Sequence, residues 1–355
     1  MYRSKNLDTL KFGLQAAGDL FGMVKCGVEA EKAGFDMVWV GNHLTFWFTD
    51  VQYPETFVTL SCIAMQTKDI RIGPGVTDIY LRHPAVVAQT IATLDVLSKG
   101  RVNFGIGAGE EMNLIPFGLR FDRPIARLRE GVRVIKTLWE ATPSSPVDFK
   151  GEYYTLKNAF IQVRPLQKPH PPIYISATGR LALRLVGELA DGWYAHLHSP
   201  ETFKESVQEI NAQALKVGRD PQNIEKFAFV FASVAKDYDA ALRSIRTPAS
   251  MVLALARERL KTLGYELKTP EWMTMEHIVI TEANLKLLRD AASQVPVEAL
   301  QATMAFGTPD DCISKFEAFQ KAGATGIIIY NASPDKEESF NLFRTKIIPY
   351  FKNVS

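Results

Sequence analysis

Eight short apolar runs, separated by stretches with the period of amphipathic helices, constrain the fold of this chain more than any other feature. The strand-like runs are 10–16, 37–42, 70–77, 102–109, 173–177, 191–197, 227–235 and 326–331. The helical stretches are 19–33, 84–98, 125–140, 181–190, 200–217 and 309–322, and four of them end at Gly34, Gly100, Gly218 and Gly323. This alternation predicts βα units arranged around a parallel sheet.

The number of units favours a closed (β/α)8 TIM barrel over an open doubly wound sheet. An open sheet normally has fewer units and a phosphate-binding glycine turn after its first strand. Here that turn reads Ala17-Gly18-Asp19. We therefore predict an α/β fold of the TIM-barrel class, whose functional groups stand at the C-terminal ends of the strands.

Two segments interrupt the alternation. Residues 143–172, between the fourth and fifth strands, are rich in proline and aromatic residues, and 149–154 predicts a short hairpin. Residues 243–305, between the seventh and eighth strands, are helical by pattern around 251–263 and 282–292. Long insertions at the functional rim of a barrel usually cover a site and select its substrate. Because no linker divides the chain, we predict a single domain over 1–355.

The composition points to a small-molecule partner. The chain has 355 residues, with 41 basic against 39 acidic side chains and a formal net charge of +2. Such a balance gives no electrostatic footprint for nucleic acid or a membrane surface. Three dispersed cysteines form no C-x-x-C pair, and the sequence shows neither a signal-peptide core nor a long apolar span. We predict a cytoplasmic protein with free thiols.

The fourth strand carries the most distinctive strand end. Gly105, Gly107 and Gly109 alternate through its second half and lead directly to Glu110. Glycines on one face of a strand let another backbone or a flat ligand approach closely. Glu110 would then stand at the mouth of a site. The alternative is a tight bend followed by a solvated carboxylate.

The second and third strands end in further candidate groups. His43, after the second strand, is a candidate general acid or base or else a hydrogen-bonded loop histidine. Trp47 follows it, either as core or as the wall of a pocket. In the third strand, glycine before the β-branched Val76 predicts a bulge or strained peptide at Gly75, with a plain Pro-Gly turn as the alternative.

The fifth strand ends in a possible anion site. Ser176-Ala177-Thr178-Gly179-Arg180 directly precedes a helix, where backbone N–H groups, a hydroxyl and a guanidinium suit a phosphate. A helix cap with an exposed arginine is the alternative. A metal site is not predicted, because the six histidines show no H-E-x-x-H spacing. His196 and His198 are the only close pair, and strand alternation would put both on one face.

Taken together, these motifs resemble the bacterial-luciferase-like superfamily, and within it the branch that uses the deazaflavin coenzyme F420. The resemblance covers nearly the whole chain. Its strongest parts are Trp39-Val-Gly-Asn-His43 with Trp47, Arg71-Ile-Gly-Pro-Gly-Val76-Thr with Arg82-His-Pro84, Ala92-Thr-Leu-Asp95 with Gly100-Arg101, and Gly107-Ala-Gly-Glu110-Glu-Met-Asn113.

The resemblance implies a (β/α)8 barrel with the deazaflavin across the strand ends. It also implies a non-prolyl cis peptide at Gly75–Val76 beneath the ring, and a coenzyme phosphate at Thr178, Gly179 and Arg180. Asn42 stands where many relatives carry an aspartate. The implied cofactor-binding residues are Asn42, Gly75, Val76, Thr77, Gly107, Asn113, Ser176, Ala177, Thr178, Gly179 and Arg180.

The resemblance also implies catalytic roles, because dehydrogenases of this branch use a histidine, a tryptophan and a glutamate. The matching residues are His43, Trp47 and Glu110. His43 is expected to take a hydroxyl proton in the oxidative direction, Trp47 to position or stabilise, and Glu110 to be the acid toward the deazaflavin. Such groups are needed because the deazaflavin itself carries only hydride.

The substrate stays open at this point. Segments 195–199 and 300–304 lack the lysines and arginine with which glucose-6-phosphate members hold their phosphate, which argues against a sugar phosphate. Methylenetetrahydromethanopterin reductases share the Gly-Pro-Gly-Val-Thr run, but they carry a glutamate where Gln15 stands and lack a counterpart of Glu110. We predict an F420-dependent oxidoreductase acting on an alcohol or carbonyl compound, with the pterin reductase as the alternative.

Two other functional classes remain open, and experiment can distinguish each of them from an F420-dependent oxidoreductase. One is an FMN-dependent monooxygenase of the same barrel, and the other is a barrel retained as a binding or assembly protein. Members of this superfamily are commonly dimers through early barrel helices, and the apolar helix after Pro54 is compatible with a homodimer.

Overall fold

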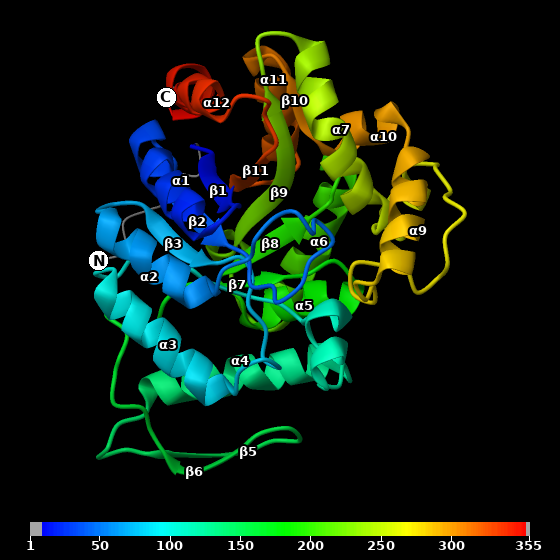
Figure 1. Ribbon diagram of the computed structural model, residues 1–355. Helices are drawn as coiled ribbons and strands as arrows, with labels where there is room; N and C mark the ends of the chain where they lie inside the picture. Colours follow the sequence, from blue (N-terminus) through cyan, green and yellow to red (C-terminus); the bar gives the residue numbers. More distant parts are fainter. Residues whose placement is uncertain (1–8, 353–355) are drawn as a thin grey trace.

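The computed structural model describes residues 9–352 and shows eight parallel strands in a ring (Figure 1). Their hydrogen-bonded order is β3-β2-β1-β11-β9-β8-β7-β4, and bridges from Ile72 to Val102 and from Thr77 to Ile106 join β3 to β4. The strands are β1 (Lys11–Ala16), β2 (Met37–Val40), β3 (Arg71–Pro74), β4 (Phe104–Ile106), β7 (Ile173–Ser176), β8 (Gly192–His196), β9 (Glu225–Val234) and β11 (Gly326–Asn331). The predicted TIM barrel is confirmed.

Helices surround this ring and begin or end at recognisable caps. Asp19 accepts a hydrogen bond from the N–H of Gly22 at the start of α1, and Gly34 ends it with a φ of 85°. The outer helices are α1 (Leu20–Ala33), α2 (Thr56–Gln66), α3 (Pro84–Leu97), α4 (Pro124–Glu140), α5 (Arg180–Leu189), α6 (Pro200–Lys216), α11 (Pro309–Lys321), α12 (Lys336–Leu342) and α13 (Ile348–Lys352).

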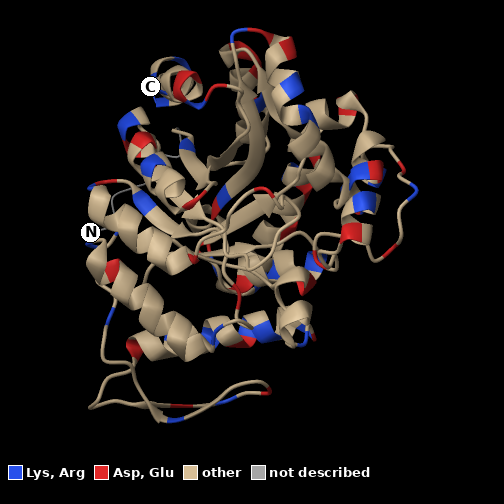
Figure 2. Ribbon diagram, in the orientation of Figure 1, with Lys and Arg blue, Asp and Glu red and all other residues tan. Residues whose placement is uncertain are grey.

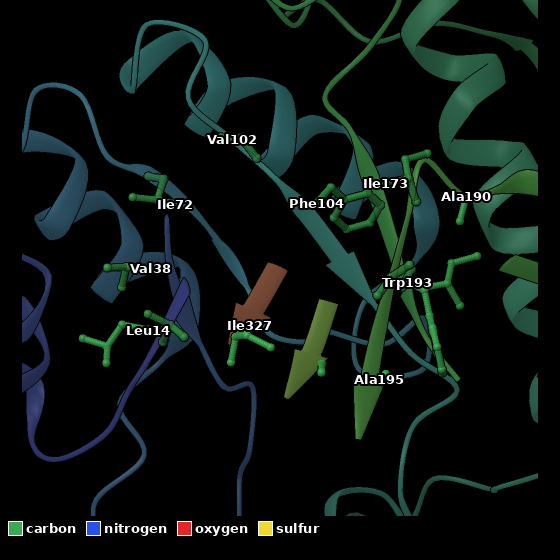
Figure 3. Close-up of a cluster of buried hydrophobic side chains, with 14 of the residues drawn as sticks. Leu14, Val38, Ile72, Val102, Phe104, Ile173, Ala190, Trp193, Ala195 and Ile327 are labelled. Carbon is green, nitrogen blue, oxygen red and sulfur yellow. The ribbon is translucent and has the colours of Figure 1, made fainter. Parts of the chain in front are cut away.

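Strand alternation divides the buried side chains into two clusters. In β1, Phe12 and Leu14 point outward and pack under the helices. In β9, Phe227, Phe229 and Phe231 belong to a second cluster that fills the inside of the barrel and its upper end. Figure 3 shows side chains of the outer cluster on several strands. Each strand is therefore buried on both faces, as parallel sheets require.

Trp39 fills the centre of the barrel interior. It is fully buried, and its ring meets Tyr174 and Tyr194 edge-on at 5.3 and 5.4 Å between ring centroids. Glycines of three neighbouring strands make room for the indole. A Cβ would come within 3.2 Å of Trp39 at Gly13, Gly73, Gly75 and Gly105. Gly105 therefore serves the packing of β3, β4 and Trp39, not the approach of a ligand.

The first insertion lies between the fourth and fifth barrel strands and contains a hairpin, as predicted, but it lies away from the barrel mouth. The hairpin of β5 (Val147–Lys150) and β6 (Thr155–Ala159) lies outside α3 and α4 (Figure 1). Backbone N–H groups of Tyr153 and Tyr154 donate to Glu130 of α4 at 2.8 and 2.6 Å. No residue of 143–172 lines the pocket that opens at the C-terminal ends of the strands. The expectation that this segment covers the site is wrong, because the excursion follows α4 instead of preceding it.

The second insertion does cover the barrel mouth. It contains the end of α7 (Tyr238–Ala254), then α8 (Arg257–Thr262), α9 (Glu282–Ser293) and α10 (Val297–Thr303). The expected helix around 251–263 is thus split into two, and α7 begins earlier than predicted. A short strand that the sequence analysis missed, β10 (Ala305–Gly307), pairs with the end of β9 outside the ring.

Charged side chains lie mostly on the outer helices and loops, whereas the barrel strands carry few (Figure 2). Across residues 9–352, no helix combines the length and the apolar character needed to cross a bilayer.

Candidate active site

A pocket opens at the C-terminal ends of the strands, and all eight barrel strands or the loops directly after them contribute to it. Residues of the second insertion close one side. The lining includes Gln15, His43, Val76, Glu110, Ser176, His196, Phe229, Tyr330, Val252 and Met275. Placement of chemistry at this end of a barrel follows the general rule for the fold.

The pocket brings together most of the residues that the sequence singled out. The three proposed catalytic residues, His43, Trp47 and Glu110, all line it. So do Asn42, Gly75, Val76, Thr77, Gly107, Asn113, Ser176, Ala177 and Thr178. Gly179 and Arg180 do not. The peptide bond between Gly75 and Val76 is cis in this structure.

Arg180 points away from the pocket. Its side chain is 72% exposed, and its Nε lies 3.3 Å from the carboxylate of Glu209, which also pairs with Arg184. The start of α5 has no side-chain cap, so its first N–H groups remain available. The guanidinium of Arg259 of α8 lies beside this helix start, and its Nη2 donates to the carbonyl oxygen of Thr178 at 3.3 Å.

Asn113 links the loop after β2 to the loop after β4. It ends a short helical turn, Glu111–Asn113, and is 3% exposed. Its Oδ1 accepts hydrogen bonds from the backbone N–H groups of Leu44 and Thr45 at 2.8 and 3.1 Å. Its Nδ2 lies 3.1 Å from Nδ1 of His43 and donates to Oε2 of Glu110 at 3.2 Å. His43 and Glu110 are themselves close, at 3.4 Å.

The protonation of this group follows from burial. Desolvation, together with the facing ring of His196, lowers the pKa of His43 to about 3. Desolvation, with the nearby carboxylates of Glu276 and Asp78, raises the pKa of Glu110 to about 8. At pH 7, His43 is therefore neutral and most molecules keep the proton on Glu110.

Aromatic rings form the wall beside His43. Phe46 lies 4.4 Å from the His43 ring and 3.8 Å from the Trp47 ring, measured between centroids. Tyr53 meets both Phe46 and His43. On the opposite side, His196 packs against Phe229 at 4.5 Å. The pocket therefore suits a ligand with apolar or aromatic surface.

Three buried polar atoms around the pocket have no hydrogen-bond partner among the described residues. They are Nδ2 of Asn42, Nε1 of Trp47 and Oγ1 of Thr77. Buried polar groups are rarely left unpaired, so orphaned atoms in a pocket mark positions that a ligand can satisfy. Two are donors, and the Thr77 hydroxyl can donate or accept.

Sequence reasoning missed several pocket residues. Aromatic residues at every second position of β9 give Phe229 and Phe231, a signal that strand periodicity could have supplied. From the sequence, His196 is a candidate only as a partner of His198. Leu197, with a φ of 55°, turns the chain, so that His198 leaves the pocket lining and meets Arg259 with 3.0 Å between Nε2 and Nη2. The expectation that the two histidines share one face is wrong.

Comparison with known proteins identifies the family. The family model for luciferase-like monooxygenases matches residues 9–326. The chain belongs to this family.

Within the luciferase-like family, several relatives match over almost their whole length. The F420-dependent glucose-6-phosphate dehydrogenase of Microbacterium testaceum is 30% identical, covering 96% of this chain and 97% of the relative. The 5,10-methylenetetrahydromethanopterin reductase of Archaeoglobus fulgidus is 29% identical, covering 97% and 100%. The structure of an F420-dependent secondary alcohol dehydrogenase with an F420–acetone adduct superposes with a TM-score of 0.83 at 27% identity, covering 97% of this chain and 99% of the other.

Across residues 9–352 of this luciferase-like protein, no group of three or more His, Cys, Asp or Glu side chains is arranged to hold a metal ion.

Proposed function

We propose that the protein is an F420-dependent oxidoreductase that interconverts a small neutral alcohol and the corresponding carbonyl compound. The observation that carries this proposal is the pairing of a neutral histidine and a protonated carboxyl group in one pocket, His43 beside Glu110 at 3.4 Å. These are the groups that proton transfer to and from a substrate oxygen requires.

The relatives support F420 as the coenzyme, since several curated relatives and two solved structures, at 27% and 26% identity, carry its name. The residues present also fit such a group. Asn42 and Thr77 offer unpaired polar atoms. Gly107 keeps the floor low, because a Cβ there would lie 2.9 Å from Val76. The uncapped start of α5, with Arg259 beside it, suits a phosphate.

Each group of the chain has a definable task in this reaction. A bound deazaflavin supplies or accepts the hydride. His43 would face the substrate oxygen with its outer ring nitrogen, and Trp47 would donate its free Nε1–H nearby. The aromatic wall of Phe46 and Tyr53 excludes water from the reacting groups.

The pocket composition supports a neutral substrate. Among its described lining residues, none is lysine or arginine, and the ionisable acids are Asp78 and Glu110. A phosphorylated sugar would meet no cation in this lining, which agrees with the sequence argument against it. A pterin could use the aromatic wall, but Gln15 stands where the pterin reductases carry a glutamate, and its Oε1 accepts the hydroxyl hydrogen of Tyr194 at 2.8 Å.

The decisive experiment measures binding first and turnover second. We expect purified protein to perturb the absorbance spectrum of F420 and, with reduced F420, to reduce short neutral ketones such as acetone. Glucose 6-phosphate and methylenetetrahydromethanopterin serve as comparison substrates. Oxygen consumption with reduced FMN, together with no binding of F420, would overturn the proposal in favour of a monooxygenase.

We also propose that the protein is a cytoplasmic homodimer. Large apolar side chains remain exposed on the outer surface of α2 and α3, including Met65 at 70%, Val58 at 55% and Val86 at 48%. Exposed apolar patches of this kind are typical of interfaces between subunits. Free thiols at Cys26, Cys62 and Cys312 support a reducing compartment.

A further inference from the structure

Hydrogen bonds to Asn113 decide which nitrogen of His43 carries the proton. The amide oxygen of Asn113 already accepts two backbone N–H groups, from Leu44 and Thr45, which fixes the orientation of the amide. Its NH2 group therefore faces Nδ1 of His43 at 3.1 Å. An amide NH2 can only donate, so Nδ1 must accept. The neutral imidazole then holds its hydrogen on Nε2.

The carboxyl group of Glu110 completes the arrangement. Its Oε2 lies 3.4 Å from the same Nδ1. With Nδ1 as an acceptor, an ionised Oε2 would set one lone pair against another, whereas a protonated Oε2 can donate to Nδ1 and share the single lone pair of Nδ1 with the Asn113 N–H in a three-centre contact. The surroundings favour the proton, because Glu276, Asp78 and Tyr53 all face Glu110 and none of them is a cation. His196, also neutral, faces His43.

We propose that Glu110, His43 and Asn113 form a proton relay, in which Glu110 passes its proton to Nδ1 of His43 while Nε2 of His43 gives its proton to the substrate oxygen. This inference rests on the proposed function. It moves Glu110 from an acid directed at the deazaflavin to the proton source behind His43. Asn113 is the positioning residue of the relay, because it selects the tautomer that the transfer needs.

The transfer balances without forming a charged imidazole ring. In carbonyl reduction, the substrate carbon gains a hydride from the reduced deazaflavin and the C=O π electrons move to oxygen. The oxygen bonds the proton of Nε2, and the N–H electron pair stays on the ring. The lone pair of Nδ1 takes the proton of Glu110, which is left as a carboxylate. After the product leaves, Nε2 takes a proton from solvent as Nδ1 returns its proton to Glu110, which restores the starting tautomer and the protonated carboxyl group. In alcohol oxidation every proton moves the opposite way.

The tautomer can be tested on coenzyme-free protein by NMR with ring-15N-labelled histidine. We expect the Nε2–H form for His43, assigned through the signals lost in His43→Asn. In Asn113→Asp an oxygen replaces the NH2 group that faces Nδ1, so the ring should change to the Nδ1–H form. His277, which pairs with Glu111 at 2.9 Å, is the internal control and should not change. An Nδ1–H form in the unmodified protein would overturn the relay, whatever the variant does.

The proton on Glu110 is visible independently by infrared difference spectroscopy. A protonated carboxyl band should be present at pH 7, vanish in Glu110→Gln and disappear as the pH rises through about 8. Glu111→Gln is the matched control and should keep the band. Absence of a band that depends on Glu110 would rule the relay out.

Turnover separates the relay from the proposed function. With F420 bound, carbonyl reduction should slow as the pH rises through about 8 and alcohol oxidation should accelerate, because they need Glu110 protonated and ionised, respectively. Glu110→Gln should lower kcat about 100-fold or more, with the Kd for F420 unchanged. A profile that does not depend on Glu110 refutes the relay. Failure to bind F420, with both spectroscopic results as expected, refutes the function alone.

Discussion

Glu110 is a residue whose environment opposes ionisation. Its carboxyl group is held beside Glu276 and Asp78 and has a raised pKa, about 8 against an ordinary 4.5. The unfolded chain releases this proton near pH 4.5, and the folded chain only near pH 8. Folding is therefore penalised progressively as the pH rises between these values, and the full cost is present above pH 8.

Glu110→Gln should consequently make the protein more stable while impairing catalysis. Glutamine keeps the shape without a charge, so we expect the free energy of unfolding at pH 7 to rise by about 1–3 kcal/mol. The gain should be absent at pH 4, below both pKa values. Urea titrations at the two pH values measure it. An equal effect at pH 4 and pH 7 would show that the gain comes from packing instead of ionisation.

The sequence alone predicts which residues stand at the strand ends. It does not predict which of these residues form hydrogen bonds with each other. His43 and Glu110 follow strands whose ends are clear from apolar runs. The hydrogen bonds of Asn113 depend on two loops 70 residues apart meeting in space, which no local pattern specifies. Likewise, Arg259 reaches Thr178 only because the second insertion folds over the barrel.

Two glycines at β4 have different roles: Gly105 lies in the strand, and Gly107 directly follows it. A Cβ on Gly105 would lie 2.1 Å from the carbonyl oxygen of Pro74 in the neighbouring strand. A Cβ on Gly107 would meet Val76 at 2.9 Å and Ser176 at 3.7 Å, and both of these are pocket side chains. Only the contact of Gly105 with Pro74 involves a backbone atom that cannot move aside.

Gly105→Ala should therefore destabilise the fold far more than Gly107→Ala. We expect Gly105→Ala to cost about 3 kcal/mol or more, as overpacking against a fixed backbone does. Gly107→Ala should fold but bind F420 less tightly, since the floor of the pocket rises. Thermal unfolding and spectral titration of both variants provide the comparison. Similar melting temperatures for the two variants would contradict it.

Some family motifs turn out to hold elements together. Asp95 of α3 is fully buried and accepts hydrogen bonds from the backbone N–H groups of Leu166 and Gln167 and from the Gln167 side chain at 2.7–3.0 Å. Arg101 donates to the carbonyl oxygens of Ala64 and Ile70. These residues carry the resemblance to the family, yet they lie away from the pocket.

Asp95→Ala should remove the fully buried acceptor of three hydrogen bonds whose donors are partly buried. Because a hydrogen bond to a charged group contributes about 1.5–3 kcal/mol, we expect a total loss of about 3 kcal/mol or more. Asp148→Ala is the matched control, since Asp148 accepts a single backbone N–H, from Asn158, on the exposed hairpin. Chemical denaturation should show less than about 1 kcal/mol for this control. Comparable losses in the two variants would mean that Asp95 does not anchor the segment.

At the scale of the whole molecule, the number of alternating strand-like and helical segments is enough to predict the barrel, because eight βα units can close in very few ways. The same count does not predict at which end of the barrel the first insertion emerges. Whether an excursion precedes or follows a helix decides at which end of the barrel it emerges, and 143–172 follows α4. β10, with three residues, is too short for a periodic signal.

The proposed homodimer depends on the surface of the whole molecule. Met65→Lys places a charge in the apolar surface of α2 and should shift the protein from dimer to monomer. Leu215→Lys on α6, at a site of similar exposure, 65%, is the control and should leave the mass unchanged. Analytical ultracentrifugation distinguishes the two. A monomeric unmodified protein would refute the proposed dimer.

The second insertion shares one apolar cluster with the inside of the barrel, so that Val252 and Leu288 belong to the same packed body as Trp39 and Phe229. In evolution, this shared packing links the shape of the pocket to the stability of the core. A substitution in α7 that reshapes the pocket for a new substrate also perturbs the core, and the lineage must recover stability elsewhere. The hairpin 147–159 carries no such coupling to the pocket and is free to drift. Directed evolution of substrate range should therefore accumulate compensating changes in the barrel interior, with few in the hairpin.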